Sequence, residues 1–101
     1  MRFNTLANLE ICIKIALEKE MPYIGVKIQM QGFEQPEVII NPFENFETKL
    51  AYYQKAYNDD LTLKTFNGIK IIGFTYGNCY SDIEDDLVSE FEKISISKEE
   101  M

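Results

Sequence analysis

Residues 61–76 have the sequence LTLKTFNGIKIIGFTY, in which two strand-like runs flank Asn67-Gly68. The runs at 61–66 and 69–76 are rich in β-branched and aromatic residues, which favour strands. An Asn-Gly pair favours a two-residue hairpin turn, because both turn residues must adopt positive φ angles. The sequence therefore predicts an antiparallel hairpin that turns at Asn67-Gly68.

A similar pair of strands is expected earlier in the chain. Residues 23–31 alternate between apolar and other side chains, which is typical of a half-buried strand. The residues from Gly32 to Pro36 favour a turn, and residues 37–40 form the second strand of the pair. The apolar positions of the first strand are Ile24, Val26, Ile28 and Met30.

Three helices alternate with these strand pairs. The first helix is expected at residues 5–20, with Thr5 as its N-cap residue. Asn41 is expected to cap the second helix, with Pro42 in its first position. Ser81 and Glu84 have the spacing of a capping box for the third helix. The apolar stripes of the first two helices are Leu6, Leu9, Ile13, Ala16 and Leu17, and Phe43, Phe46, Leu50, Tyr53 and Tyr57.

The predicted element order is α-β-β-α-β-β-α, which defines an α+β fold. We expect a single domain at residues 1–95 and a disordered tail at residues 96–101. Short hairpins make neighbouring strands antiparallel, so the expected sheet is four-stranded and mainly antiparallel, with helices packed on it. The segments ANLE at 7–10 and ENFE at 44–47 occupy matching places in two helices, which suggests a tandem αββ repeat.

One face of the expected sheet carries aromatic side chains that need cover. Regular alternation along 69–76 places Phe74 and Tyr76 opposite the first two helices, on the same face as Phe66. A large apolar patch on a sheet is normally covered by another element or another chain. We therefore expect the third helix, a second copy or a partner to cover Phe66, Phe74 and Tyr76. Ile11, Ile15 and Tyr52 lie off the core stripes and are further candidates for contact.

The composition disfavours most catalytic chemistry. The chain has no histidine, so the commonest general base near neutral pH and the commonest zinc ligand are absent. It also has no Gly-rich phosphate loop and no Cys-x-x-Cys pair. Cys12 is expected to be a buried apolar residue, and carboxylates near Cys79 oppose thiolate formation. We expect no enzyme activity, no cofactor and no metal.

The sequence also indicates a cytoplasmic location. No apolar run approaches the roughly 20 residues that cross a bilayer, and the N-terminus has no signal-peptide pattern. The two cysteines fit a reducing compartment, and we do not expect them to form a disulfide. The protein is therefore expected to have no membrane partner.

The net charge of −7 is concentrated near the C-terminus. Residues 81–101 hold eight carboxylates and two lysines, whereas residues 1–80 hold nine carboxylates and eight basic residues. A helical step of about 100° per residue places acidic residues on one face of the third helix. That acidic face consists of Asp82, Asp85, Asp86, Glu90 and Glu92, opposite Ile83, Leu87, Phe91 and Ile94.

Two interpretations of the acidic face stay open. Regularly spaced carboxylates can imitate a phosphate backbone and occupy the basic groove of a DNA- or RNA-handling protein. Alternatively, they form the solvated side of an amphipathic helix. A calcium or magnesium site is disfavoured, because a helix splays these side chains apart and no glycine supplies a sharp turn. Direct nucleic-acid binding is disfavoured because the net negative charge repels phosphates.

Two segments carry a resemblance to a known group of proteins. Residues 37–42 (EVIINP) and 49–58 (KLAYYQKAYN), within an overall pattern over residues 3–90, resemble small acidic proteins encoded by prophages and integrative elements of Gram-positive bacteria. Proteins from such elements often bind and inhibit host machinery, including restriction and CRISPR nucleases. By analogy, the resemblance implies a similar context for this chain, and it assigns no functional residue.

These observations predict a non-enzymatic protein-binding protein. The first expectation is a mobile-element-encoded inhibitor or modulator of a basic host nucleic-acid-handling enzyme, which acts through the acidic face as a DNA mimic. The alternative is a homodimeric structural or regulatory accessory protein of a phage or integrative element that uses the aromatic sheet face. A small enzyme that uses Cys79 or carboxylates is the third interpretation.

Overall fold

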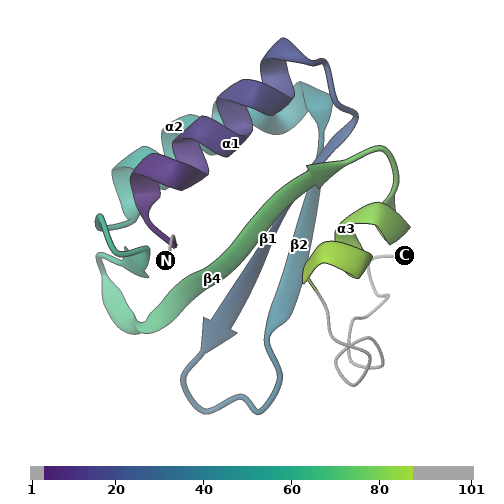
Figure 1. Cartoon of the computed structure of the whole chain (residues 1–101). Helices are drawn as coiled ribbons and strands as arrows, with labels where there is room; N and C mark the ends of the chain where they lie inside the picture. Colours follow the sequence, from purple (N-terminus) through teal and green to yellow (C-terminus); the bar gives the residue numbers. More distant parts are fainter. Residues whose placement is uncertain (1–3, 88–101) are drawn as a thin grey trace.

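The computed structural model describes residues 4–87, and they form an α+β fold with the predicted element order (Figure 1). The sheet has four strands in the order β2-β1-β4-β3, and every neighbouring pair is antiparallel. The tandem repeat remains a prediction. The elements are α1 (Leu6–Glu18), β1 (Tyr23–Met30), β2 (Glu37–Pro42), the 3-10 helix η1 (Phe43–Asn45), α2 (Phe46–Ala56), β3 (Thr62–Leu63), β4 (Phe66–Gly77) and α3 (Tyr80–Leu87).

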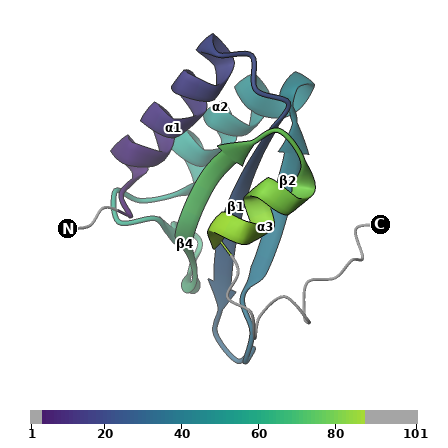
Figure 2. The same ribbon diagram turned by 45° about the vertical axis from the view of Figure 1, so that its right-hand side comes forward.

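Helices α1 and α2 cover one face of the sheet, and α3 lies on the other face (Figures 1 and 2). The Thr5 hydroxyl accepts a hydrogen bond from the Asn8 N–H at 3.2 Å, so the expected cap of the first helix is confirmed. The core between the helices and the sheet matches the predicted stripes except at Phe43, which lies in η1 with an exposed fraction of 40%. Its fully buried side chains include Leu9, Ile13, Val26, Phe46, Tyr53 and Ile71.

The predicted turn at Asn67-Gly68 is wrong. Leu63 pairs with Phe66, so the chain turns at residues 64–65, and residues 67–68 lie inside β4. Within residues 4–87, neither Asn67 nor Gly68 has the positive φ that an Asn-Gly hairpin turn requires. The Gly68 carbonyl instead accepts a hydrogen bond from the Gln31 N–H at 2.7 Å, which ties this segment to the end of β1.

Tertiary contacts just after α2 explain the earlier turn. The Lys64 N–H donates to the Ala56 carbonyl at 2.8 Å, and the Asn58 N–H donates to the Thr62 carbonyl at 2.8 Å. Leu61 is fully buried between them and has a φ of 69°, an unusual value for a residue with a Cβ. These contacts hold the chain against the end of α2, so β3 is only two residues long.

The expected caps of the second and third helices are also wrong. Asn41 and Pro42 belong to β2, and the Asn41 side chain accepts a hydrogen bond from the Asn45 side chain at 3.0 Å. Because η1 intervenes, α2 begins only at Phe46. Helix α3 begins at Tyr80, whose ring packs edge-on against Tyr23 with centroids 5.1 Å apart, so Ser81 lies inside the helix.

A bulge in β4 reverses the predicted alternation of its side chains. Lys27 pairs with Gly73, but Ile28 pairs with Ile71, so Ile72 is an extra residue in β4. As a result Phe74 pairs with Val26 and Tyr76 pairs with Ile24, and directly paired residues share a face. Phe74 and Tyr76 therefore pack against the α1 and α2 core, contrary to the expectation that they lie on the opposite face.

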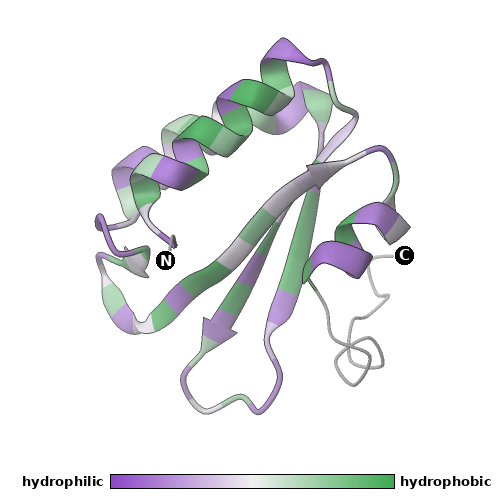
Figure 3. Cartoon of the chain, in the orientation of Figure 1, coloured by the Kyte–Doolittle hydropathy of each residue, from purple (hydrophilic) through white to green (hydrophobic). Residues whose placement is uncertain are grey.

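Helix α3 covers the opposite face over three glycines of β1 and β4. A Cβ at Gly25 would collide with the Ile83 side chain, and a Cβ at Gly77 would lie 3.2 Å from Ile83 Cγ1. A Cβ at Gly73 would lie 3.3 Å from Leu87 Cδ2. The glycines therefore let α3 pack closely, and Ile83 is fully buried. Figure 3 shows that the rest of α3 is mainly hydrophilic.

Candidate functional site

An apolar groove of about 610 Å³ lies beside β4. Helix α1 forms one wall, the second half of β4 forms the floor, and Leu87 of α3 closes the far side. Ile11 and Ile15 stand on the rim with exposed fractions of 53% and 36%. The lining residues are Asn4, Asn8, Ile11, Cys12, Ile15, Gly73, Phe74, Tyr76 and Leu87. This concavity is termed the β4 groove below.

The groove follows an open edge of the sheet. Strand β3 pairs with β4 only at Phe66 and Lys70, so within residues 4–87 no strand flanks residues 72–77 on that side. The Ile72 carbonyl accepts a hydrogen bond from the Asn4 side-chain amide at 2.7 Å, so the Ile72 carbonyl points away from β1. The C=O and the following N–H of one peptide point in opposite directions, so the Gly73 N–H points toward β1, with which Gly73 pairs beyond the bulge. Regular alternation from Gly73 onward turns the N–H and C=O of Phe74 and Tyr76 outward.

The same alternation defines the other edge of the sheet, on β2. Val26 pairs with both Phe74 and Ile39. Because the backbone of Phe74 points away from β1, Val26 directs its own N–H and C=O toward Ile39. Val38, Ile40 and Pro42 are then the β2 residues whose backbones point outward, and Pro42 has no N–H to offer.

Lys19, the C-cap residue of α1, contacts the polar end of the groove. The Lys19 ammonium donates a hydrogen bond to the Tyr76 hydroxyl at 3.4 Å and lies 5.6 Å from the ring centroid of the same residue. Burial raises the pKa of the Cys12 thiol to about 11, so this cysteine is a neutral apolar group at physiological pH. The groove therefore offers apolar side chains and outward backbone groups, but no activated nucleophile.

The structure places only part of the predicted acidic face. Asp82, Asp85 and Asp86 are exposed on α3, whereas Glu90 and Glu92 lie outside the described residues, as do Phe91 and Ile94. The Asp82 carboxylate accepts a hydrogen bond from the Asn78 N–H at 3.1 Å, and the Asp86 carboxylate accepts one from the Thr75 hydroxyl at 2.8 Å. Two of the carboxylates are thus held in fixed orientations on the face of the sheet that α3 covers.

The three aromatic residues predicted as a dimer or partner face do not form one surface. Phe66 has an exposed fraction of 51%, at the start of β4. Phe74 and Tyr76 are half-buried beside α1 at the other end of the strand, where they line the β4 groove. The sequence therefore identified two groove residues but assigned them to the wrong face.

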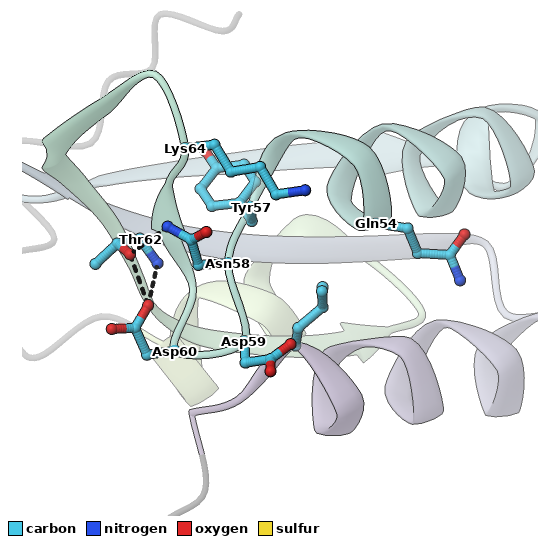
Figure 4. A pocket seen from close by; sticks show the side chains of 8 residues that line it. Gln54, Tyr57, Asn58, Asp59, Asp60, Thr62 and Lys64 are labelled. Carbon is cyan, nitrogen blue, oxygen red and sulfur yellow. Dashed lines mark hydrogen bonds between the residues drawn. The ribbon is translucent and has the colours of Figure 1, made fainter.

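A second, polar pocket of about 540 Å³ lies where the chain leaves α2 (Figure 4). Its lining includes Gln54, Asn58, Asp59, Asp60, Thr62 and Lys64. The Asp60 carboxylate accepts hydrogen bonds from the Thr62 hydroxyl at 2.6 Å and the Thr62 N–H at 3.1 Å, which lower its pKa. These hydrogen bonds stabilise a tight turn, so we assign this pocket no ligand. In the sequence, the run Asn58-Asp59-Asp60 favours a turn at this place, because Asn and Asp side chains hydrogen-bond to nearby backbone groups.

The remaining candidates for chemistry do not form a site. Cys12 and Cys79 are free, and the exposed Cys79 sulfur has the Ser81 hydroxyl 3.4 Å away. Within residues 4–87, no three of the cysteine and acidic side chains come together in an arrangement that could hold a metal ion. In the same part of the chain, no helix is long and apolar enough to span a membrane.

No family model, curated protein or solved structure matches this chain. The β4 groove and the carboxylates of α3 are the features of residues 4–87 that bear most directly on function.

Proposed function

We propose that this chain is a protein-binding domain and that the β4 groove is its binding surface. One observation carries the proposal: residues 72–77 form an uncharged strand edge with outward backbone groups, directly beside an apolar groove. An unpaired strand edge is a template for another strand, which can form main-chain hydrogen bonds along it. The groove would supply the side-chain contacts that select the partner.

The exposed rim supports this assignment. Ile11 and Ile15 are one helical turn apart on α1, and both are aliphatic side chains at the mouth of the groove. Apolar residues that surround a concave surface are typical of binding sites, whereas single exposed apolar residues are common on any protein. Ile11 is thus a suitable position at which to test the groove.

The test is capture of binding partners by tagged wild-type protein, Ile11→Lys and Phe33→Lys. Phe33 is a matched control, because it is an exposed apolar residue in the loop between β1 and β2, with an exposed fraction of 62%. We expect Ile11→Lys to lose the specific partner and Phe33→Lys to keep it, with the same far-UV circular dichroism for all three proteins. Identical capture by wild type and Ile11→Lys would contradict the proposal.

A second candidate function is inhibition of a basic nucleic-acid-handling protein through α3. Asp82 and Asp86 are exposed and held by hydrogen bonds, and a pre-oriented carboxylate loses less conformational entropy when it binds a cation. The mobile-element context suggested by the sequence fits this function. Under this candidate, the acidic face would bind where nucleic-acid phosphates normally bind.

Neutral variants that keep the hydrogen bonds separate this second candidate from the first. The double variant Asp82→Asn and Asp86→Asn removes two charges but keeps an oxygen that can accept from the Asn78 N–H and the Thr75 hydroxyl. We expect it to lose any partner that moderate salt releases from the wild type, because screening weakens exposed charge pairs. Unchanged capture of a salt-sensitive partner would rule out this role for the two carboxylates.

A further inference from the structure

We infer that the β4 groove binds a second copy of this chain, and that the two β4 edges pair antiparallel to join both four-stranded sheets. This inference rests on the proposed function and names the partner. A twofold axis through the interface presents the same surface from both protomers, so any outward group on one edge meets an outward group on the other. The backbone groups, apolar side chains and charges along the β4 edge can each pair with those of a second copy in this way.

The backbone of β4 can pair with itself beyond the bulge. A twofold axis near Thr75 places Phe74 of one protomer opposite the partner's Tyr76, and the partner's Phe74 opposite Tyr76. Both residues direct N–H and C=O outward, so each pair can exchange two hydrogen bonds. The segment GFTYG at 73–77 has no charge and no proline, the usual features that prevent edge pairing.

Helix α1 adds a matching apolar contact. It runs alongside β4, with Asn4 near Ile72 at one end and Lys19 near Tyr76 at the other. The same twofold axis therefore brings the two α1 helices together in antiparallel orientation. Ile11 and Ile15 then lie opposite the partner's Ile15 and the partner's Ile11, which would bury the rim of both grooves.

The charges beside this apolar pair are complementary. Glu10 and Lys14 each precede one of the two isoleucines, so they have the same four-residue spacing on α1. In an antiparallel helix pair, Glu10 lies near the partner's Lys14 and Lys14 lies near the partner's Glu10. On the face that α1 covers, a second copy thus matches the edge in backbone pairing, apolar contact and charge. On the opposite face, the Asp86 carboxylates that the two Thr75 hydroxyls hold would lie near the axis.

The first measurement is sedimentation equilibrium of the full chain over a range of concentrations. We expect a dimer for wild type and Phe33→Lys, and dimerisation at least about tenfold weaker for Ile11→Lys, because each dimer would bury two lysines. A dimer equally tight in Ile11→Lys would overturn the inference. A wild type that is monomeric throughout would also overturn it, while an Ile11-dependent foreign partner would leave the proposed function standing.

Two further readouts test the mode of pairing. Glu10→Lys and Lys14→Glu should each weaken the dimer by about two- to fivefold, and the double swap should restore it. Amide exchange of Phe74 and Tyr76 should slow as concentration rises, whereas that of Val38 and Ile40 should not change. Amide exchange that slows only at Val38 and Ile40 would overturn antiparallel β4 pairing. A double-swap variant that dimerises more weakly than both single variants would also overturn it.

Discussion

The two outer edges of the sheet differ in how well they resist pairing with another strand. On β2, Pro36 precedes the strand, Glu37 begins it, and Pro42 removes an outward donor at its end. On β4, residues 73–77 have no charge and no proline, and two outward residues keep both backbone groups. Of these two edges within residues 4–87, it is β4 that combines complete outward backbone groups with an adjacent apolar groove, and we therefore expect β4 to pair more readily than β2.

Loss of the α3 contact should have the largest effect, because α3 packs on both β2 and β4. Ile83→Ala should reduce the free energy of unfolding by about 3 kcal/mol, since Ile83 is fully buried against the glycines of the sheet. Urea denaturation measures this loss. Phe33→Ala, at an exposed position in the loop between β1 and β2, is the control and should cost less than about 1 kcal/mol. Similar losses for both variants would mean that α3 does not stabilise the two edge strands.

The rate at which the Cys12 thiol is alkylated tests whether Cys12 is buried in the apolar lining of the β4 groove. Its pKa is raised to about 11 by burial, so the thiolate is scarce at pH 8. Alkylation should be about a hundredfold slower than for a thiol with an unshifted pKa, and its rate should rise about tenfold per pH unit toward pH 11. Peptide mass spectrometry measures this rate, with the exposed Cys79 as the internal control. Equal rates at both cysteines at pH 8 would contradict the buried position of Cys12.

Gly25 lies midway between the two edges, since it pairs with Ile40 of β2 and Thr75 of β4. Gly25→Ala should reduce the free energy of unfolding by about 2 kcal/mol, because its Cβ would displace Ile83 of α3. Gly73→Ala should cost less, because the nearest atom to its Cβ is the end of the Leu87 side chain at 3.3 Å. Thermal denaturation of both variants gives the order. The reverse order would place the close approach of α3 over β4 instead of β1.

The smallest expected effect comes from a matched pair of substitutions on either side of Val26. Ile39→Ala on β2 and Phe74→Ala on β4 each remove a half-buried side chain that packs on the core, and each should cost about 1–2 kcal/mol of stability. Only Phe74→Ala should also weaken self-association, because it alone lines the groove. Denaturation and sedimentation together separate these effects. Equal weakening of the dimer by both would show that the edges are equivalent.

The sequence predicted the type and order of the helices and strands correctly, but it misplaced the residues at which several of them begin and end. Hydrophobic periodicity predicted the order of the helices and strands and the fully buried Leu9, Ile13 and Val26, because core burial determines that pattern. The turn at Asn67-Gly68 was misplaced because contacts of residues 58–64 with the end of α2 prevailed over local turn preference. Local preferences are weak compared with tertiary packing. The first and last residues of helices and strands are therefore predicted less accurately than their order.

The candidate site could be predicted only in part. Ile11 and Ile15 lie off the core stripe of α1, so the sequence itself makes them candidates for contact. The extra residue Ile72 could not be seen in the sequence, and it turns Phe74 and Tyr76 to the opposite face. The groove itself depends on the strand order, which leaves the second half of β4 at an edge. Hairpin patterns predict which strands are neighbours in sequence, but they do not predict which strand is outermost.

The glycines beneath α3 also bear on how this domain folds. Glycine loses more backbone entropy than any other residue on ordering, and Gly25, Gly73 and Gly77 contribute no side chains to hold β1 and β4 together. That end of the strand pair gains its apolar contact on the α3 face only when Ile83 docks. We therefore expect the closing of this end of the sheet and the docking of α3 to occur as one cooperative step.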